Sequence, residues 1–407
     1  MKNAFLCAVV LVLSCGFAVG RVTERVLYNF SNTLEGADPQ AALIFDDSGN
    51  LYGTTPYGGM YGYGTVFELT PNQDGSWTEN VLYSFMDGSD GADPVCNLIF
   101  DAAGNIYGTT QSGGDAPFPD GDGVVFKLTP SDNGGWTETV IRSFEGRTDA
   151  SHPASGLVFD PAGNLYGTTV LGGTQGYGTV FELTPNQDGS WTEAVLHSFK
   201  GGNDGSGPLG SLVIDGSGNL YGTTASGGPK LAGTVFKLSP AGGGVWNGSL
   251  LHTFTGGNDG AYPTGALTFD ADGNLYGATR EGAIPNCGDG GCGVIFKLTP
   301  SLGEGRWNTF ALHTFTNYGG FHPNGSLVFD AVGNLYGTTQ LATGFLNGTV
   351  FRLSRRKNGG MAIVTYSFNG EDGNTPYAGV ILDSKGRVYG TTDLGGSGYG
   401  VVFRITP

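Results

Sequence analysis

The seven-residue stretch "GNLYGTT" constrains this 407-residue chain more than any other feature, because it recurs along the whole of it. Identical or near-identical copies begin at Gly49, Gly104, Gly163, Gly218, Gly273, Gly333 and Gly386. Their spacing gives units of roughly 55 residues, a period typical of propellers and solenoids. Sevenfold repetition indicates a structural unit rather than a single catalytic site.

Each unit contains four short segments of β-strand character. In one unit they are 211–215, 219–224, 233–239 and 246–254, which we call strands A, B, C and D. Valine, isoleucine, tyrosine, phenylalanine and threonine dominate these segments, while glycine, asparagine, aspartate and proline fill the gaps. No helical periodicity of any length is present. The sequence therefore predicts an all-β fold.

The residues of these strands predict how neighbouring units pack. Strand A is almost entirely apolar, which favours burial on both faces, as on an inner propeller strand. A glycine recurs in strand B, and it predicts the close approach of a bulky aromatic side chain from the next blade. All five tryptophans share the first position of strand D, and we interpret them as packing anchors between blades rather than as ligand-stacking residues. They are Trp77, Trp136, Trp191, Trp246 and Trp307.

The two ends of the chain predict a closed ring. Residues 21–30 match the strand D pattern of 77–85, and the chain ends directly after a strand C. The economical solution is a seven-bladed β-propeller of four-stranded blades in which residues 22–30 complete the last blade. Closure removes exposed sheet edges, whereas the alternative, an open β-solenoid, would leave both ends unpaired.

Composition and the N-terminus favour an exported, acidic protein. Residues 1–20 have the positive start, apolar centre and small-residue cleavage site of a signal peptide, which leaves 21–407 as a single propeller domain. Cys15 raises the alternative of lipid anchoring, although the residues before it fit a lipobox poorly. A formal charge of −17 argues against nucleic acid and anionic membrane surfaces as partners. We expect a glycine-rich, monomeric protein of the extracellular space or cell envelope, without a membrane span.

Three cysteines follow the predicted signal peptide. Cys287 and Cys292 in "CGDGGC" predict a short disulfide, as is common in exported proteins. Their sequence neighbourhood offers no histidine or further cysteine to complete a metal site. Cys96 occupies a position filled elsewhere by small residues, so we interpret it as a buried, inert thiol.

The line "GLVFDPAGNLYGTTVLGGTQGYGTVFELTP" at 156–185 closely resembles the secreted GloVer tandem-repeat family, whose members carry assorted C-terminal anchors. The resemblance covers essentially the whole chain after the signal peptide. A looser similarity links "GLVFDPAGNLYG" to NHL-type propellers. The resemblance implies an exported, propeller-like repeat array without an assigned activity.

Two recurrent acidic positions could in principle bind a cation. Every A–B turn reads Asp-x-x-Gly-Asn or nearly so, which we interpret as turn chemistry, because calcium needs six to eight oxygen ligands. A second acidic position lies in the D–A loops, four residues before a recurrent proline. It is filled by Glu35, Asp90, Asp149, Asp204, Asp259, Gly319 and Asp372. Turn shaping is the simpler interpretation; the alternative is an electronegative mouth that attracts calcium or a basic ligand, with Asp90, Asp204, Asp259 and Asp372 as weak metal candidates.

The residue directly before the recurrent proline varies from unit to unit. It is Asp38, Asp93, His152, Gly207, Tyr262, His322 or Thr375. If the ring closes, these residues surround the entrance of the axial channel, so the six with side chains are our candidates for ligand binding. An unconstrained rim is the alternative.

No known catalytic motif is present in the sequence. The histidines His197, His252 and His313 share an outer-strand position and should lie far apart. The loops 111–123 and 280–293 depart from the repeat and are places where individual function could lie. We predict a binding or scaffold module for an extracellular carbohydrate or protein. The alternatives are a hydrolase, lyase or lactonase with a metal-assisted site at the channel mouth, and a purely structural envelope protein.

Overall fold

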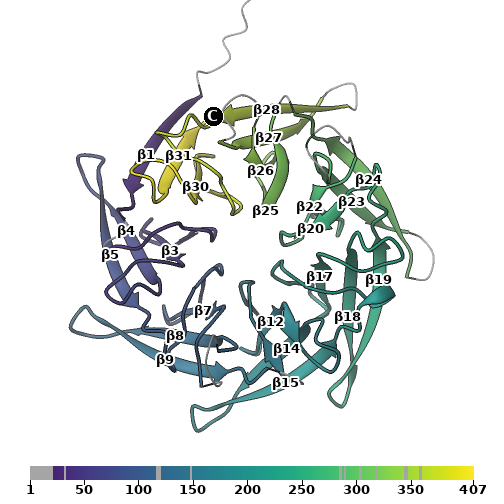
Figure 1. Ribbon diagram of the computed structural model, residues 1–407, viewed down its shortest axis with the longest axis horizontal. Coiled ribbons are helices and arrows are strands. Elements are labelled where there is room, and N and C mark those ends of the chain that lie inside the picture. Colours follow the sequence, from purple (N-terminus) through teal and green to yellow (C-terminus); the bar gives the residue numbers. More distant parts are fainter. Residues whose placement is uncertain are drawn as a thin grey trace, which may run out of the picture.

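Seven antiparallel sheets form the blades of a closed ring in the computed structural model (Figure 1). The structure describes residues 22–407 except 32–33, 116–120, 147–148, 284–286, 288–289, 302–304, 318, 343–346 and 357–359. The predicted signal peptide, with Cys15, lies outside the described residues. Within the described ranges the only helical element is a 3-10 turn at Gly202–Asp204, and no helix there could cross a membrane. The all-β prediction is confirmed.

Each blade has the strand order A-B-C-D from the axis outward. The A strands of blades 1 to 7 are β2 (Ile44–Phe45), β6 (Ile99–Phe100), β11 (Val158–Phe159), β16 (Val213–Ile214), β21 (Thr268–Phe269), β25 (Phe321–Phe329) and β29 (Ile381–Leu382). The B strands are β3 (Leu51–Thr55), β7 (Ile106–Thr110), β12 (Leu165–Thr169), β17 (Leu220–Thr224), β22 (Leu275–Glu281), β26 (Leu335–Leu341) and β30 (Val388–Thr392). The C strands are β4 (Thr65–Pro71), β8 (Val124–Pro130), β14 (Thr179–Pro185), β18 (Thr234–Gly242), β23 (Val294–Pro300), β27 (Thr349–Arg355) and β31 (Val401–Thr406). The D strands are β5 (Trp77–Ser84), β9 (Trp136–Ser143), β15 (Trp191–Ser198), β19 (Val245–Thr253), β24 (Trp307–Thr314), β28 (Met361–Ser367) and, for blade 7, β1 (Thr23–Asn29).

The N-terminal strand closes the ring, as predicted. Strand β1 pairs antiparallel with β31, with Val26 opposite Phe403, so that the last blade has the order β1-β31-β30-β29. Figure 1 shows the first strand of the chain lying beside the last. The two ends thus complete one sheet, and neither leaves an unpaired sheet edge of the kind that an open array would have.

The hydrophobic core is divided among the seven junctions between adjacent blades. One cluster, for example, joins Tyr52 and Leu82 of blade 1 to Leu98 and Phe126 of blade 2. At every junction a buried phenylalanine that follows strand D packs edge-on against the strand C phenylalanine of the next blade, with ring centroids 5.0–5.3 Å apart. Such edge-to-face pairs add stability beyond the area that they bury. Blade-to-blade contacts therefore hold the ring together.

Two packing predictions were wrong in detail. Strand A is only two residues long in most blades and half-buried, because it lies at the axis, whereas strand B is buried along its whole length in five blades. The strand B glycine does meet an aromatic ring, but that ring comes from its own blade. A Cβ atom on Gly53 would lie 2.7 Å from Cζ of Phe67, its neighbour across the sheet. The glycine therefore makes room within a sheet rather than between blades.

The D–A and B–C loops lie at the same end of the ring, as the sequence predicts. In blade 1 the N–H of Ala37 donates to the carbonyl of Tyr57 over 2.8 Å, and Asn374 makes the same contact with Leu394 in blade 7. In blade 3 the contact is a short ladder between β10 (Ala150–Ser151) and β13 (Leu171–Gly172). In blade 5 it is made by β20 (Ala261–Pro263) against β22. Both loop sets therefore border one mouth of the channel.

Candidate functional site

The residues before the recurrent proline form a ring of strained backbone at the blade junctions. The six ligand-binding candidates all have a left-handed backbone, with φ of 55–58°. They are Asp38, Asp93, His152, Tyr262, His322 and Thr375. This conformation is uncommon for residues other than glycine, and it costs of order 1–3 kcal/mol where it is maintained. The seventh position, Gly207, adopts the same conformation, with φ of 61°.

Backbone hydrogen bonds to the preceding blade hold these residues in the left-handed conformation. Each N–H of the ring donates over 2.8–3.1 Å to a carbonyl in the B–C loop of the preceding blade. The acceptors, in ring order, are Tyr399, Tyr63, Asp122, Tyr177, Ala232, Cys292 and Asn347. The pre-proline residue is therefore a structural link between blades, whatever else its side chain does.

The channel wall itself is formed by the residues that directly follow the recurrent proline. A cavity of about 310 Å³ on the axis is lined by all seven residues that directly follow the proline, and of the six candidates only Tyr262 lines it. These residues are Gln40, Val95, Ala154, Leu209, Thr264, Asn324 and Tyr377. Sequence reasoning missed them, although they differ from unit to unit as much as the residues before the proline do. Their variation was the signal that could have identified them.

Polar side chains in the wall hold the inner backbone of neighbouring blades. Asn97 Oδ1 accepts a hydrogen bond from the Ala42 N–H at 2.8 Å, and Ser211 Oγ accepts one from the Gly156 N–H at 2.9 Å. Thr264 donates to Asn324 Oδ1 across the junction of blades 5 and 6. The wall is thus rigid, and it presents amides, hydroxyls and the two tyrosines Tyr262 and Tyr377 to the cavity.

One side of the mouth is acidic. Asp38, Asp93 and Asp393 all interact electrostatically with the half-exposed Tyr57, and their blades (7, 1 and 2) are adjacent. Burial raises the pKa of Asp393 to about 6, and the charge of Asp38 acts in the same direction. Gln40 donates from Nε2 to Asp393 Oδ1 at 2.9 Å and so connects this acidic arc to the cavity.

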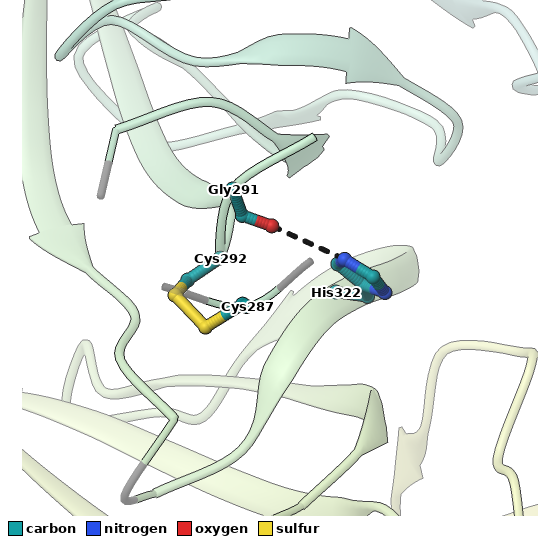
Figure 2. Close-up of a disulfide and its surroundings, with 4 residues drawn as sticks. All are labelled: Cys287, Gly291, Cys292 and His322. Atoms are coloured by element: carbon teal, nitrogen blue, oxygen red, sulfur yellow. Dashed lines mark hydrogen bonds between the residues drawn. A yellow bond between two sulfur atoms is a disulfide. The ribbon is translucent and has the colours of Figure 1, made fainter. Parts of the chain in front are cut away.

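The opposite side carries a cation and a neutral histidine. Arg280 lines the cavity from blade 5. In the next blade, Nε2 of His322 bonds to the Gly291 carbonyl at 3.1 Å, beside the disulfide between Cys287 and Cys292 (Figure 2). Burial, reinforced by Arg280, lowers the pKa of His322. A carbonyl partner requires the proton on Nε2, so the disulfide-closed loop selects one tautomer of this imidazole.

His152 belongs to a Ser-His-Asp group, but its geometry is not that of a nucleophilic triad. Ser151 Oγ donates to Asp122 Oδ1 at 2.5 Å and lies 2.6 Å from His152 Nδ1, whereas Nδ1 is 3.9 Å from Asp122 Oδ1. The hydroxyl therefore lies between the other two groups, where a triad would place the histidine. Ser151 is also almost fully buried. The group links the loop 111–123 to the pre-proline ring.

The acidic D–A loop residues are bonded to their own loops and to the end of the strand D that precedes each loop. Asp90 accepts from the Tyr83 hydroxyl at 3.0 Å, and Asp372 accepts from the Tyr366 hydroxyl at 2.6 Å. Asp204 and Asp259 pair with His197 and His252 at 3.2 and 3.1 Å. Each carboxylate also accepts a nearby backbone N–H. Among the described residues, no three histidine, cysteine, aspartate or glutamate side chains gather where they could hold a metal ion.

The A–B turn aspartates make the local bonds expected of turn residues. Asp160 Oδ1 accepts from the N–H groups of Ala162 and Asn164, both at 2.9 Å, and Oδ2 accepts from the side chains of Asn164 and Tyr166. Equivalent bonds occur in the other blades, for example at Asp215. Each carboxylate stabilises its own turn.

A glutamate adjoins the D–A carboxylate at four consecutive junctions. Two residues after the tryptophan position, strand D carries a glutamate that faces the acidic residue of the preceding blade. Burial of each glutamate, together with the charge of that acidic residue, raises its pKa to about 7; the four are Glu24, Glu79, Glu138 and Glu193. Arg142 bridges one pair, with Nη2 2.7 Å from Asp149 and Nε 2.5 Å from Glu193. At the other three junctions, those of blades 3/4, 4/5 and 5/6, the glutamate position holds Gly248, Thr309 or Ile363 opposite a histidine.

The fold and the axial cavity define the class of protein: a repeat β-propeller with a small, polar channel site. The chain belongs to the family of the Gloeobacter/Verrucomicrobia repeat, whose model matches residues 17–158, 116–304 and 282–407. This confirms the resemblance seen in the sequence. No curated protein matches the chain significantly.

Two of the solved structures that match the chain are distant from it in sequence. One, from Thermus thermophilus, is described as a "putative oxidoreductase (glucose dehydrogenase)"; it is 17% identical over 77% of this chain and 96% of its own, with a TM-score of 0.45. Another, a protein of unknown function from Dyadobacter fermentans, is 11% identical over 95% and 99%, with a TM-score of 0.43.

Proposed function

We propose that this chain is an exported binding module that takes a polar extracellular ligand, a carbohydrate or a protein segment, into the mouth of its axial channel. One observation carries the proposal: seven side chains that differ from blade to blade line a single cavity of about 310 Å³, on a scaffold that otherwise repeats. Ligand sites are typically concave, with a few fixed polar groups. The signal-like residues 1–20 and the disulfide between Cys287 and Cys292 support export.

The charges of the mouth suggest how such a ligand is oriented. The acidic arc of Asp38, Asp93 and Asp393 is centred on blade 1 and lies across the channel from Arg280, because blades 1 and 2 are each three positions away from blade 5 in a seven-membered ring. Fixed charges of opposite sign at the two sides of a narrow site attract and orient a polar molecule. Gln40 and Gln111, which line the cavity on the side of the acidic arc, supply amide groups for neutral hydrogen bonds.

Calorimetric titration with a panel of neutral and acidic oligosaccharides and short peptides tests this function. We expect at least one ligand to bind, and the variants Gln111→Ala and Tyr377→Ala to weaken it by about tenfold or more. The exposed amide Asn80 on strand β5 gives the matched control Asn80→Ala, which should bind as the original does. Equal binding by all three variants would place the ligand elsewhere. A parallel calcium titration tests the cation alternative.

An enzyme acting in the same mouth is the second candidate. A carboxyl of raised pKa beside another carboxylate is an arrangement used for general acid–base chemistry, and Asp393 beside Asp38 has it. A hydrolase, lyase or lactonase of this kind would be detected by a panel of glycosides, polyuronates and lactones, assayed with and without calcium. Loss of turnover in Asp393→Asn, with binding retained, would support this candidate over the binding module.

A further inference from the structure

A repeated set of three contacts surrounds the strand B tyrosine at the Trp-bearing junctions. Tyr107 has Phe159 of the next blade at 5.2 Å and Trp191 at 6.4 Å between ring centroids, and Lys127 Nζ lies 5.6 Å from its ring. Tyr221 has the same three partners, with Trp307 at 6.2 Å. Trp246 lies 6.0 Å from Tyr166, and Trp77 and Trp136 pack against the core clusters that contain Tyr389 and Tyr52. A tryptophan thus completes the cover of the tyrosine at five junctions.

The junction between blades 5 and 6 lacks the third contact. Tyr276 keeps Phe329 at 5.0 Å and Lys297 at 5.2 Å, but Met361 stands in the tryptophan position. Tyr276 is the one strand B tyrosine that is only half-buried; the other six are 2–6% exposed. An open groove of about 1060 Å³, lined by Tyr276, Phe329 and Met361, lies here. The groove therefore occupies the place where an indole lies at other junctions.

The other junction without a tryptophan has a smaller opening. At the junction of blades 6 and 7, Val22 stands in the tryptophan position and lines a pocket of about 300 Å³, but Tyr336 there remains only 5% exposed. At the junction of blades 5 and 6 a further ring, Phe310, adds to the apolar wall and is 51% exposed. An exposed aromatic beside an uncovered one is the usual sign of an interaction surface rather than of a core.

The rim of this groove carries charges of both signs. Asp270, Asp272 and Asp330 line it, and Asp270 and Asp330 accept hydrogen bonds within their own A–B turns. Strand β27 ends with Arg355 opposite Met361, where five other blades place a proline opposite the tryptophan. Arg355 lies close enough to Tyr276 to affect its ionisation, and both it and Arg356 are exposed. These two adjacent arginines make the part of the rim beside Met361 cationic, and that part complements a carboxylate.

We propose that the groove between blades 5 and 6 is a docking site for a partner protein, which inserts a tryptophan side chain against Tyr276 and places a neighbouring carboxylate on Arg355. The partner's indole takes the place that a tryptophan of this chain occupies at five other junctions. We infer a protein partner because tryptophan side chains are the usual source of an indole ring. Tryptophan and arginine are the side chains most often found at the energetic centres of interfaces. The site lies on the outer part of the ring and is independent of the channel.

The test uses the full chain and the peptide acetyl-Asp-Trp-Asp-amide with a 5-fluorotryptophan, observed by ¹⁹F NMR. We expect concentration-dependent broadening of the fluorine signal by the original protein. Met361→Trp fills the groove in cis and should weaken binding by about tenfold or more. Val22→Trp adds the same ring at the junction of blades 6 and 7 and should leave binding unchanged. Arg355→Gln should remove the preference for the acidic peptide over acetyl-Asn-Trp-Asn-amide.

Three results would overturn the proposal. They are the absence of broadening at millimolar peptide, equal binding by the Met361→Trp and original proteins, and equal binding of a peptide with leucine in place of tryptophan. A thermal melt of each variant accompanies the titration. Since Met361→Trp restores a ring that five other junctions already contain, its melting temperature should not fall, and Phe310→Ala provides a second way to weaken the site.

Discussion

The outer rim of the ring consists of two arcs that share a geometry and differ in chemistry. At the junctions from blade 6/7 to blade 2/3, a tyrosine or arginine faces two carboxyl groups, such as those of Asp90 and Glu138. At the following three junctions a histidine takes that place, and the second carboxyl group is absent. The comparison shows that the repeat fixes where these groups lie but not which groups they are, and we therefore expect the two arcs to respond to pH in opposite directions.

The signs follow from the pKa values. In the first arc, Glu24, Glu79 and Glu138 have a pKa of about 7 when folded, against an ordinary value of 4.5. Between these pH values the folded chain keeps protons that the unfolded chain releases, so rising pH destabilises the fold. In the second arc, burial lowers the pKa of His252 below its ordinary 6.5. Below that pH the unfolded chain binds a proton that the folded chain resists, so falling pH is destabilising.

The largest effect should come from breaking the one bridged pair of the first arc. Arg142→Met keeps the apolar stem but leaves Glu193 and Asp149 without their shared cation. We expect a loss of about 2–3 kcal/mol in the free energy of unfolding at pH 8, because uncompensated, half-buried carboxylates remain. The loss should be smaller at pH 5.5, where Glu193 takes up a proton. Urea denaturation measures both, and adding Glu193→Gln should recover most of the loss at pH 8; no recovery would contradict the coupling.

The next effect concerns the whole first arc. We expect the melting temperature to rise by a few degrees as the pH is lowered from 8 to about 5.5, since the glutamates gain their protons in this window. The triple variant Glu24→Gln, Glu79→Gln, Glu138→Gln should flatten that dependence and raise the melting temperature at pH 8. The exposed Glu145→Gln serves as the matched control and should leave the slope unchanged. A parallel slope in the triple variant would show that other groups govern the response.

The smallest effect should come from giving one junction of the second arc the second carboxyl group that the junctions of the first arc have. Thr309 Oγ1 lies 3.0 Å from His252 Nδ1, and Asp259 lies 3.1 Å from Nε2. Thr309→Glu therefore places the imidazole between two carboxylates. We expect it to raise the pKa of His252 by about 1 or more, since an opposite charge at this distance favours the protonated ring. NMR titration of the imidazole resonances measures the change. Thr309→Gln, which adds no charge, should leave that pKa almost unaltered.

Much of the fold could be predicted from the sequence, because the same strand pattern recurs in seven units. The all-β class, the blade number and closure by residues 22–30 followed from strand counting. The tryptophans Trp191, Trp246 and Trp307 pack between blades, as predicted. Spacing alone could not decide that Gly53 faces Phe67 of its own blade, since cross-strand and inter-blade neighbours look alike along the chain.

The six ligand-binding candidates stay a prediction, while the residues that line the axial cavity lie mainly on the other side of the recurrent proline. His322 and Thr375 vary because their backbone is held by the preceding blade, which leaves their side chains free to differ. Asn324 and Tyr377, each directly after the proline, line the cavity instead. Alternation along an extended segment decides which side chain faces the axis, and a left-handed residue before a proline changes that alternation.

Closure by β1 also determines the order in which the protein can be completed during synthesis. Among the described strands, β1 (Thr23–Asn29) is made first, but its partner β31 is made last. Until then β1 lacks its partner in the sheet, although its side chains can pack against blade 1, while six other C strands of nearly the same sequence emerge one after another. Each of these receives its own D strand from the segment that follows it directly, and such local pairing is faster than any long-range competitor. The tandem arrangement thus protects the first strand from wrong partners until its own is available.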